Sequence, residues 1–151
     1  MAGQILKAVF SPVASGTADI TLLMVKAPAH VRLKIHEWEL SFQGQDNVGA
    51  PIRVQVLRVS SDGTGDTVTL KKLDEGTDET IQSSSKEGYG GTNEPTAGDI
   101  LHERYVHPQT GWHHVVPVPD DFVVEGGGRI ALKLQDPGAS VNVTGSITFE
   151  E

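Results

Sequence analysis

The chain has 151 residues and a mass of 16.1 kDa, the size of one ordinary domain. Its 12 basic and 20 acidic residues give a formal net charge of −8, which repels phosphate backbones and anionic lipid and argues against nucleic acid or a membrane as partner. The absence of Cys excludes disulfides, thiolate metal sites and a cysteine nucleophile. The longest apolar run, residues 22–25, is far shorter than a membrane span, so we expect a soluble protein made in a cytoplasm.

Val, Ile and Thr recur along the chain, and 17 Gly and 8 Pro residues interrupt every stretch long enough for a helix. Alternation of apolar and polar residues predicts strands instead. The expected strands are residues 6–10, 20–26, 31–42, 52–59, 67–73, 99–107, 112–118, 130–134 and 141–149. About eight short strands separated by turn residues are typical of an all-β, antiparallel β-sandwich. We expect a single domain over residues 1–151 with jelly-roll topology.

The phase of the alternation changes within residues 31–42. Ile35 continues an apolar series at odd positions, whereas Trp38 begins one at even positions. One extra residue at His36 or Glu37, in a β-bulge, would return the later side chains to the core. The sequence therefore predicts one long, bent strand with Trp38 buried.

Residues 74–98 are expected to form a long loop rich in Gly, Ser and acidic residues, with Ile81 and Tyr89 as its few apolar anchors. A loop of this length in a compact domain is usually functional or ordered by a partner. From Asp62 to Glu103 there are ten acidic residues against three basic ones. One edge of the protein is therefore expected to be more negative than the rest.

No catalytic, cofactor-binding or metal site is expected. There are six His, but zinc needs three or four converging ligands, and the adjacent His113 and His114 would point to opposite faces of a strand. The chain has neither a G-x-S-x-G elbow nor a phosphate-binding loop. The acidic turns at 62–66 and 74–79 lack the spacing of an EF-hand. We therefore expect a protein that is not an enzyme and carries no cofactor.

Partner binding is the remaining role for distinctive side chains. The candidates are Tyr89, Trp112, His113 and His114. An exposed Trp or Tyr is what a sugar-binding module stacks on a pyranose ring, and Trp112 lies in a predicted turn at 110–113. We favour the interpretation that Trp112 covers the end of the sandwich or a subunit interface. Histidines at a subunit contact would titrate near pH 6.5.

Three segments carry a family resemblance: IHEWELSFQG at 35–44, EPTAGDILHERYVHPQTG at 94–111 and GGGRIALKLQDPGASVNVTGSITFEE at 126–151. Together they resemble small tailed-phage capsid decoration, or cement, proteins with a jelly-roll domain. The resemblance covers most of the chain, apart from residues 62–91, and its motifs are structural.

The resemblance implies a non-enzymatic virion protein on the outer surface of the phage head, made in the cytoplasm of the bacterial host. Its partners would be the major capsid protein and its own copies, as a homotrimer that bridges neighbouring capsid subunits and stabilises the shell. Two alternatives stay open: a jelly roll of a phage fibre or tail, and a carbohydrate-binding module that uses Trp112 and Tyr89. A cupin-like metalloenzyme is also a jelly roll, but the chain does not reproduce the histidine and glutamate spacing of cupins.

Overall fold

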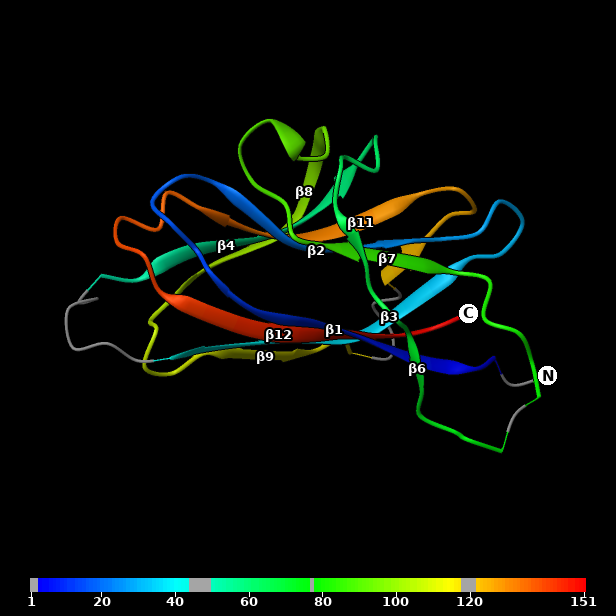
Figure 1. Ribbon diagram of the computed structural model, residues 1–151. Helices are drawn as coiled ribbons and strands as arrows, with labels where there is room; N and C mark the ends of the chain where they lie inside the picture. The colour runs from blue at the N-terminus through cyan, green and yellow to red at the C-terminus, as the bar shows by residue number, and fades with distance from the viewer. Residues whose placement is uncertain (1–2, 44–49, 77, 118–121) are drawn as a thin grey trace.

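Two antiparallel sheets pack face to face in the computed structural model, which describes residues 3–43, 50–76, 78–117 and 122–151 (Figure 1). Twelve strands lie in these residues. Sheet A contains β1 (Ile5–Ala14), β3 (Leu33–Gln43), β6 (Lys71–Lys72), β9 (Trp112–Val115), β10 (Phe122–Val124) and β12 (Asn142–Glu150). Sheet B contains β2 (Ile20–Lys26), β4 (Ile52–Val59), β5 (Asp66–Thr67), β7 (Ser84–Glu87), β8 (Ala97–Val106) and β11 (Arg129–Gln135). A 3-10 turn, η1, spans Gly91–Asn93, and no helix of the described residues is long and apolar enough to cross a membrane.

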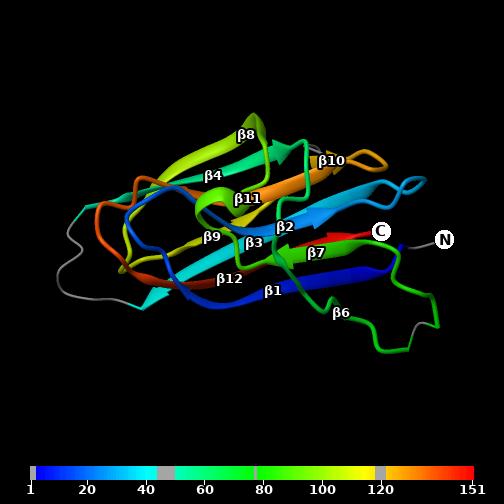
Figure 2. The same cartoon turned by 45° about the horizontal axis from the view of Figure 1, so that its top comes forward.

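Eight of the strands form four nested antiparallel pairs: β1 with β12, β2 with β11, β3 with β9, and β4 with β8. The sheets run β9-β3-β12-β1 and β8-β4-β11-β2, and Figure 2 shows β8, β4, β11, β2 and β7 side by side. This order is a jelly roll, so the predicted all-β sandwich with jelly-roll topology is confirmed. The count of about eight was too low because β5, β6, β7 and β10, of two to four residues each, extend the sheet edges.

The predicted β-bulge is confirmed in β3. Ile35 pairs with Phe149 and Glu37 pairs with Thr148, so His36 is the extra residue between two regular pairs. Ile35 and Trp38 are each 1% exposed. The bulge therefore places the apolar residues before and after it on the same, inner face of sheet A.

The main core lies between the sheets, where Phe10, Trp38 and Phe149 are the largest fully buried side chains. A second, smaller cluster lies on the outer side of sheet B, because its strand residues alternate with those of the main core. We call it the outer cluster; it consists of Met24, Leu57, Val59, Tyr89 and Ala131.

The expectation of one long loop over residues 74–98 was wrong in part. Ser84–Glu87 forms β7, which pairs with the edge of β2. Ser85 is fully buried there, and its hydroxyl donates to the backbone carbonyl of Met24 at 2.7 Å. The strand forms because β2 offers unpaired backbone groups that a neighbouring segment can satisfy. The expected strand at 67–73 is likewise divided into β5 and β6. The Gly, Asp, Asn and Pro residues at 43–51 also predict a loop between β3 and β4, and most of that range, residues 44–49, lies outside the described residues.

Candidate functional site

Strand β9 carries three of the four candidate residues. Trp112 is the partner of Leu40 across the sheet, and His114 is the partner of Trp38. Because Leu40 and Trp38 point into the core, Trp112 and His114 point inward as well. Alternation along the strand sends His113 to the outer face.

Four aromatic rings pack together inside this edge of the sandwich, as two stacked pairs. His114 lies over Trp38 with 4.6 Å between ring centroids and 23° between planes, and His102 lies over Trp112 at 5.3 Å and 21°. The two indoles meet edge to face at 5.5 Å, and the two imidazole centroids are 4.8 Å apart. These are distances at which aromatic pairs attract. We call these four residues the ring cluster.

The ring cluster joins the two sheets. His102 comes from β8 in sheet B, whereas the other three rings come from sheet A. Phe122 of β10 packs edge-on against Trp38 at 5.6 Å. Trp38 and Trp112 are 1% and 4% exposed, and both histidines are half-buried. The cluster therefore closes the side of the sandwich at which β8 and β9 end their sheets.

The surroundings of His114 favour a neutral imidazole. Burial lowers the pKa of His114 below its usual range, and the nearby bases His102, Arg104 and His113 lower it further. The indole nitrogens of Trp38 and Trp112 are buried without a hydrogen-bond partner among the described residues. The cluster thus contains two indole N–H donors and two imidazoles, and these neighbours place no negative charge beside it that would stabilise a protonated imidazole.

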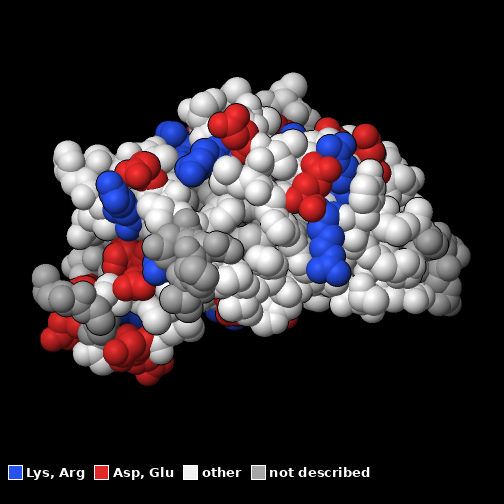
Figure 3. Space-filling model, turned by 180° about the vertical axis from the view of Figure 1, so that it is seen from behind, with Lys and Arg blue, Asp and Glu red and all other residues white. Residues whose placement is uncertain are grey.

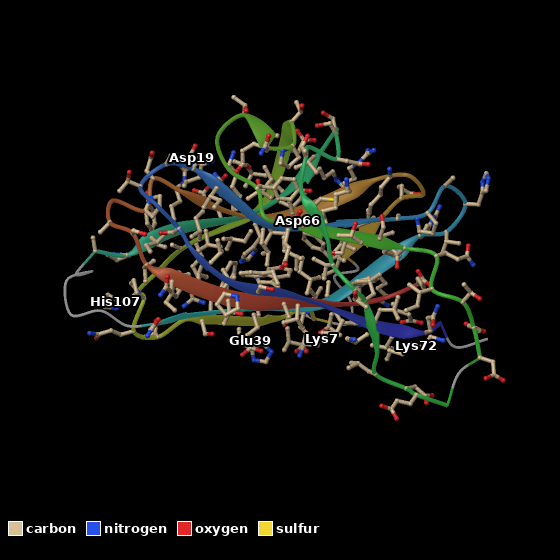
Figure 4. All side chains as sticks on the ribbon, viewed as in Figure 1. Lys7, Asp19, Glu39, Asp66, Lys72 and His107 are labelled. Atoms are coloured by element: carbon tan, nitrogen blue, oxygen red, sulfur yellow. The ribbon has the colours of Figure 1, made fainter. Side chains whose placement is uncertain are left out.

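His113 lies on the outer face of sheet A. Its Nε2 is 2.8 Å from a carboxylate oxygen of Glu37, whose other oxygen accepts a hydrogen bond from Thr148 at 3.2 Å. The hydrogen bond from His113 lowers the pKa of Glu37, against the opposing effect of burial. Figure 4 shows Lys7 and Glu39 pointing away from the sandwich on this face. His113 is therefore part of a polar, solvent-facing surface.

Tyr89 lies on the opposite side of the molecule, over sheet B. Its ring is part of the outer cluster and is 4% exposed, and its hydroxyl donates to the backbone carbonyl of Asp62 at 2.8 Å. Burial, with a smaller contribution from Asp62, raises the pKa of Tyr89 to about 12. Tyr89 therefore fixes its own segment to the sheet.

An ion-pair group holds the neighbouring turn. The Asp62 carboxylate lies 3.1 Å from Nζ of Lys26 and also pairs with the guanidinium of Arg129. The hydrogen bond from Arg129 lowers the pKa of Asp62 despite partial burial. The acidic turn at 62–66 thus attaches to β2 and β11 through Asp62.

The four candidate residues do not form one site. Trp112 and His114 lie together in the ring cluster, His113 is on the outer face of sheet A, and Tyr89 is over sheet B. Trp112 begins β9, as the strand expected at 112–118 has it, and it is buried there, so the exposed position considered for it in a turn at 110–113 is wrong. Neither Trp112 nor Tyr89 presents a free ring face to a sugar.

Sequence reasoning missed His102, which meets His114 from the other sheet. The signal for this contact is the nesting of the strand pairs, which brings β8 and β9 to the same edge. That signal becomes usable once the strand order is known.

Within the described parts of the chain, no group of three His, Asp or Glu side chains could hold a metal ion. In comparisons with known proteins, no family model matches the chain, and no curated protein or solved structure matches it either. The arrangement of residues around the two sheet edges is therefore what bears on function.

Proposed function

We propose that the chain is a non-enzymatic virion structural protein that decorates and stabilises a phage capsid as a homotrimer bridging neighbouring capsid subunits. The resemblance of residues 35–44, 94–111 and 126–151 to capsid decoration proteins suggests this role. The jelly-roll order of the strands agrees with the fold that the resemblance implies.

The observation that carries the proposal is the placement of exposed apolar side chains. Among the described residues, six large hydrophobic side chains are at least 40% exposed. They fall into two groups: Ile5, Val9 and Leu73 beside β1 and β6, and Ile100, Tyr105 and Val115 on β8 and β9. The first group lies on the outer face of sheet A towards its β1–β6 side. The second lies on the β8–β9 side of the sandwich, where Ile100 and Tyr105 face outward from sheet B and Val115 faces outward from sheet A, so this patch spans both faces of that edge.

Two different patches on opposite sides suit a head-to-tail contact between copies. Such a contact uses one patch of each copy against the other patch of the next, and it closes into a ring when the rotation allows. A trimer repeats each weak capsid contact three times, so its attachment gains avidity without any single strong contact. The surface seen from behind is mostly uncharged, with acidic and basic groups in small mixed sets (Figure 3), which suits broad contacts of this kind.

The native mass across a dilution series tests the assembly. We expect a persistent species of three times 16.1 kDa. Val9→Glu and Tyr105→Glu should each give monomers, because each places a charge in one of the two patches. An equimolar mixture of these variants should give a dimer, because each variant retains the patch that the other lacks. Thr17→Glu, in the exposed β1–β2 connection, is the control and should remain trimeric.

A wild-type monomer at every concentration, or a mixture of variants that stays monomeric, would contradict the head-to-tail trimer. Attachment is tested by sedimentation with purified phage heads that lack their decoration protein. We expect the wild-type protein to sediment with the heads and to raise the temperature at which they open. A trimer that stays in the supernatant would contradict the capsid role, although it would leave the assembly intact.

The carbohydrate-binding alternative loses its basis, because it requires exposed rings at Trp112 and Tyr89 and both are 4% exposed. A jelly roll of a phage fibre or tail uses the same fold. Sedimentation with tails rather than heads would favour it.

A further inference from the structure

The two half-buried histidines of the ring cluster face each other across the gap between the sheets. Their ring centroids are 4.8 Å apart, and each ring is stacked on a tryptophan that is at most 4% exposed. No hydrogen bond joins either imidazole to another described residue, whereas His36 and His113 each contact a carboxylate. Unlike His36 and His113, His102 and His114 therefore have no carboxylate partner among the described residues that would stabilise a protonated ring.

Among the described residues, the charged groups that bear on His114 are basic. The acidic residue next to His102 in the chain, Glu103, is turned to the outer face of sheet B, where it bonds Arg53 and Gln55. Arg104 is two residues from His102 on β8, and His113 is adjacent to His114 on β9 but is turned to the outer face beside Glu37. The other elements packed against the pair present uncharged side chains to it: Trp38 and Leu40 from β3, Val54 and Val56 from β4, Trp112 from β9, and Phe122 from β10. A positive charge on one imidazole therefore meets only further positive charge from these neighbours.

We propose that the facing pair His102 and His114 makes the β8–β9 side of the sandwich a pH-sensitive latch, closed when the imidazoles are neutral and loosened when both are protonated. One proton can be accepted, because an indole face attracts a cation. The second places two like charges 4.8 Å apart in a half-buried position beside Arg104. Opening this side to water separates and hydrates them.

The direction of the pH effect follows from linkage. The pKa of His114 is lower in the folded protein than in the unfolded chain, so near pH 6 the unfolded chain binds more protons. The stability that the neutral pair contributes is present above the ordinary histidine pKa and is lost as the pH falls through the folded value. As the pH falls, the unfolding equilibrium constant rises by up to about tenfold per pH unit for each proton that the unfolded chain binds and the folded protein does not.

Intrinsic fluorescence offers a direct test, because both tryptophans of the chain belong to the ring cluster. A protonated imidazole stacked on an indole quenches its emission. We expect emission to fall between pH 7 and pH 5 in two steps. We also expect amide exchange to increase in β8 and β9 over the same range, after correction for the intrinsic pH dependence, while β2 and β11 stay protected.

His102→Phe and His114→Phe keep an aromatic ring at each position and remove the titrating group. Each single variant should lose one fluorescence step, and the double variant should lose both, together with the increase in exchange. His30→Phe, at an exposed position before β3, is the matched control and should behave as the wild type. The double variant should also lose the steep fall in stability below pH 6.5.

Histidine titration by NMR on the unaltered protein keeps the test independent of whether the variants fold. We expect the His102–His114 pair to titrate in two coupled steps. Independent titration of the two rings would overturn the proposal, as would a double variant that keeps the wild-type pH dependence. The latch does not depend on the capsid role, because each of these measurements uses the isolated protein.

Discussion

The hydroxyl of Tyr89 donates a hydrogen bond of 2.8 Å to the backbone carbonyl of Asp62, a residue 27 positions earlier in the chain. The contact closes a loop over the outer face of sheet B. Gly63 and Gly65 lie under the ring of Tyr89, where a Cβ atom would come within 3.0 Å of it. The segment after β4 and the segment after β7 are therefore fixed to each other as well as to the sheet.

Tyr89→Phe should destabilise the protein by about 1 kcal/mol, because it removes one hydrogen bond but keeps the ring. Tyr89→Ala should destabilise it by about 3 kcal/mol or more, because it also uncovers the outer cluster. Urea unfolding measures both changes. Thr17→Ala is the control, since that side chain is exposed in the β1–β2 connection, and it should change the free energy of unfolding by less than about 0.5 kcal/mol. Equal losses for the two Tyr89 variants would contradict the importance of the ring.

Asp62→Asn should destabilise the protein by about 1 kcal/mol at neutral pH, because the carboxylate bridges two cations and is only about one-third exposed. The pKa of Asp62 is lowered from its ordinary value of 3.8. Its contribution is therefore present above that value and is lost as the pH falls through the folded pKa. The wild type and the variant should converge in stability in strong acid. The exposed pair of Arg32 and Glu125 provides the control, so Glu125→Gln should have almost no effect.

Gly145→Ala should destabilise the protein by about 3 kcal/mol. An added Cβ at this position of β12 would collide with the backbone carbonyl of Glu39, and it would lie 3.0 Å from a methyl carbon of Leu40. A backbone group in a central strand pair cannot move aside as a side-chain end can. Gly90→Ala is the matched control, because nothing lies within 4 Å of a Cβ there. Thermal unfolding of the two variants gives the comparison, and similar melting temperatures would count against the close approach of β12 to β3.

Deletion of His36 should leave the protein folded, with a loss of about 1–2 kcal/mol. Without this residue Glu37 would follow Ile35 directly, so the inward and outward positions of β3 would still alternate correctly. The loss reflects the hydrogen bond from the amide of Val116 to the carbonyl of His36. Deletion of Glu39 should instead prevent folding, because it turns the apolar residues that precede it outward. Circular dichroism distinguishes these outcomes, and two deletions with the same effect would contradict the role of the bulge.

Strand alternation is a local property, and it predicted the strands well. The predicted ranges 20–26 and 52–59 coincide with β2 and β4, and the change of phase before Trp38 located the bulge. These features depend on which face of each strand is apolar, and neighbouring residues determine that directly.

The candidate site was harder to predict because its contacts join distant segments. Tyr89 was expected in a loop, and its burial depends on a sheet face built by residues from three other strands. The contact of His102 with His114 depends on how β8 and β9 meet at one edge of the sandwich. Periodicity shows which face of a strand is buried, but it does not show which strand packs against that face.

The position of β12 sets the order in which the protein can fold as it is made. β12 lies between β1 and β3, so Leu6 can pair with Lys72 of β6 early but gains its other sheet neighbour, Phe149, only when β12 is made. While the chain grows on the ribosome, the pairs β4–β8 and β3–β9 can form, but sheet A stays divided until β12 emerges. Long-range pairing of this kind folds slowly and leaves strand edges unpaired during synthesis. High-level production should therefore benefit from slower translation or from chaperones that hold β1 and β2 apart from other nascent chains.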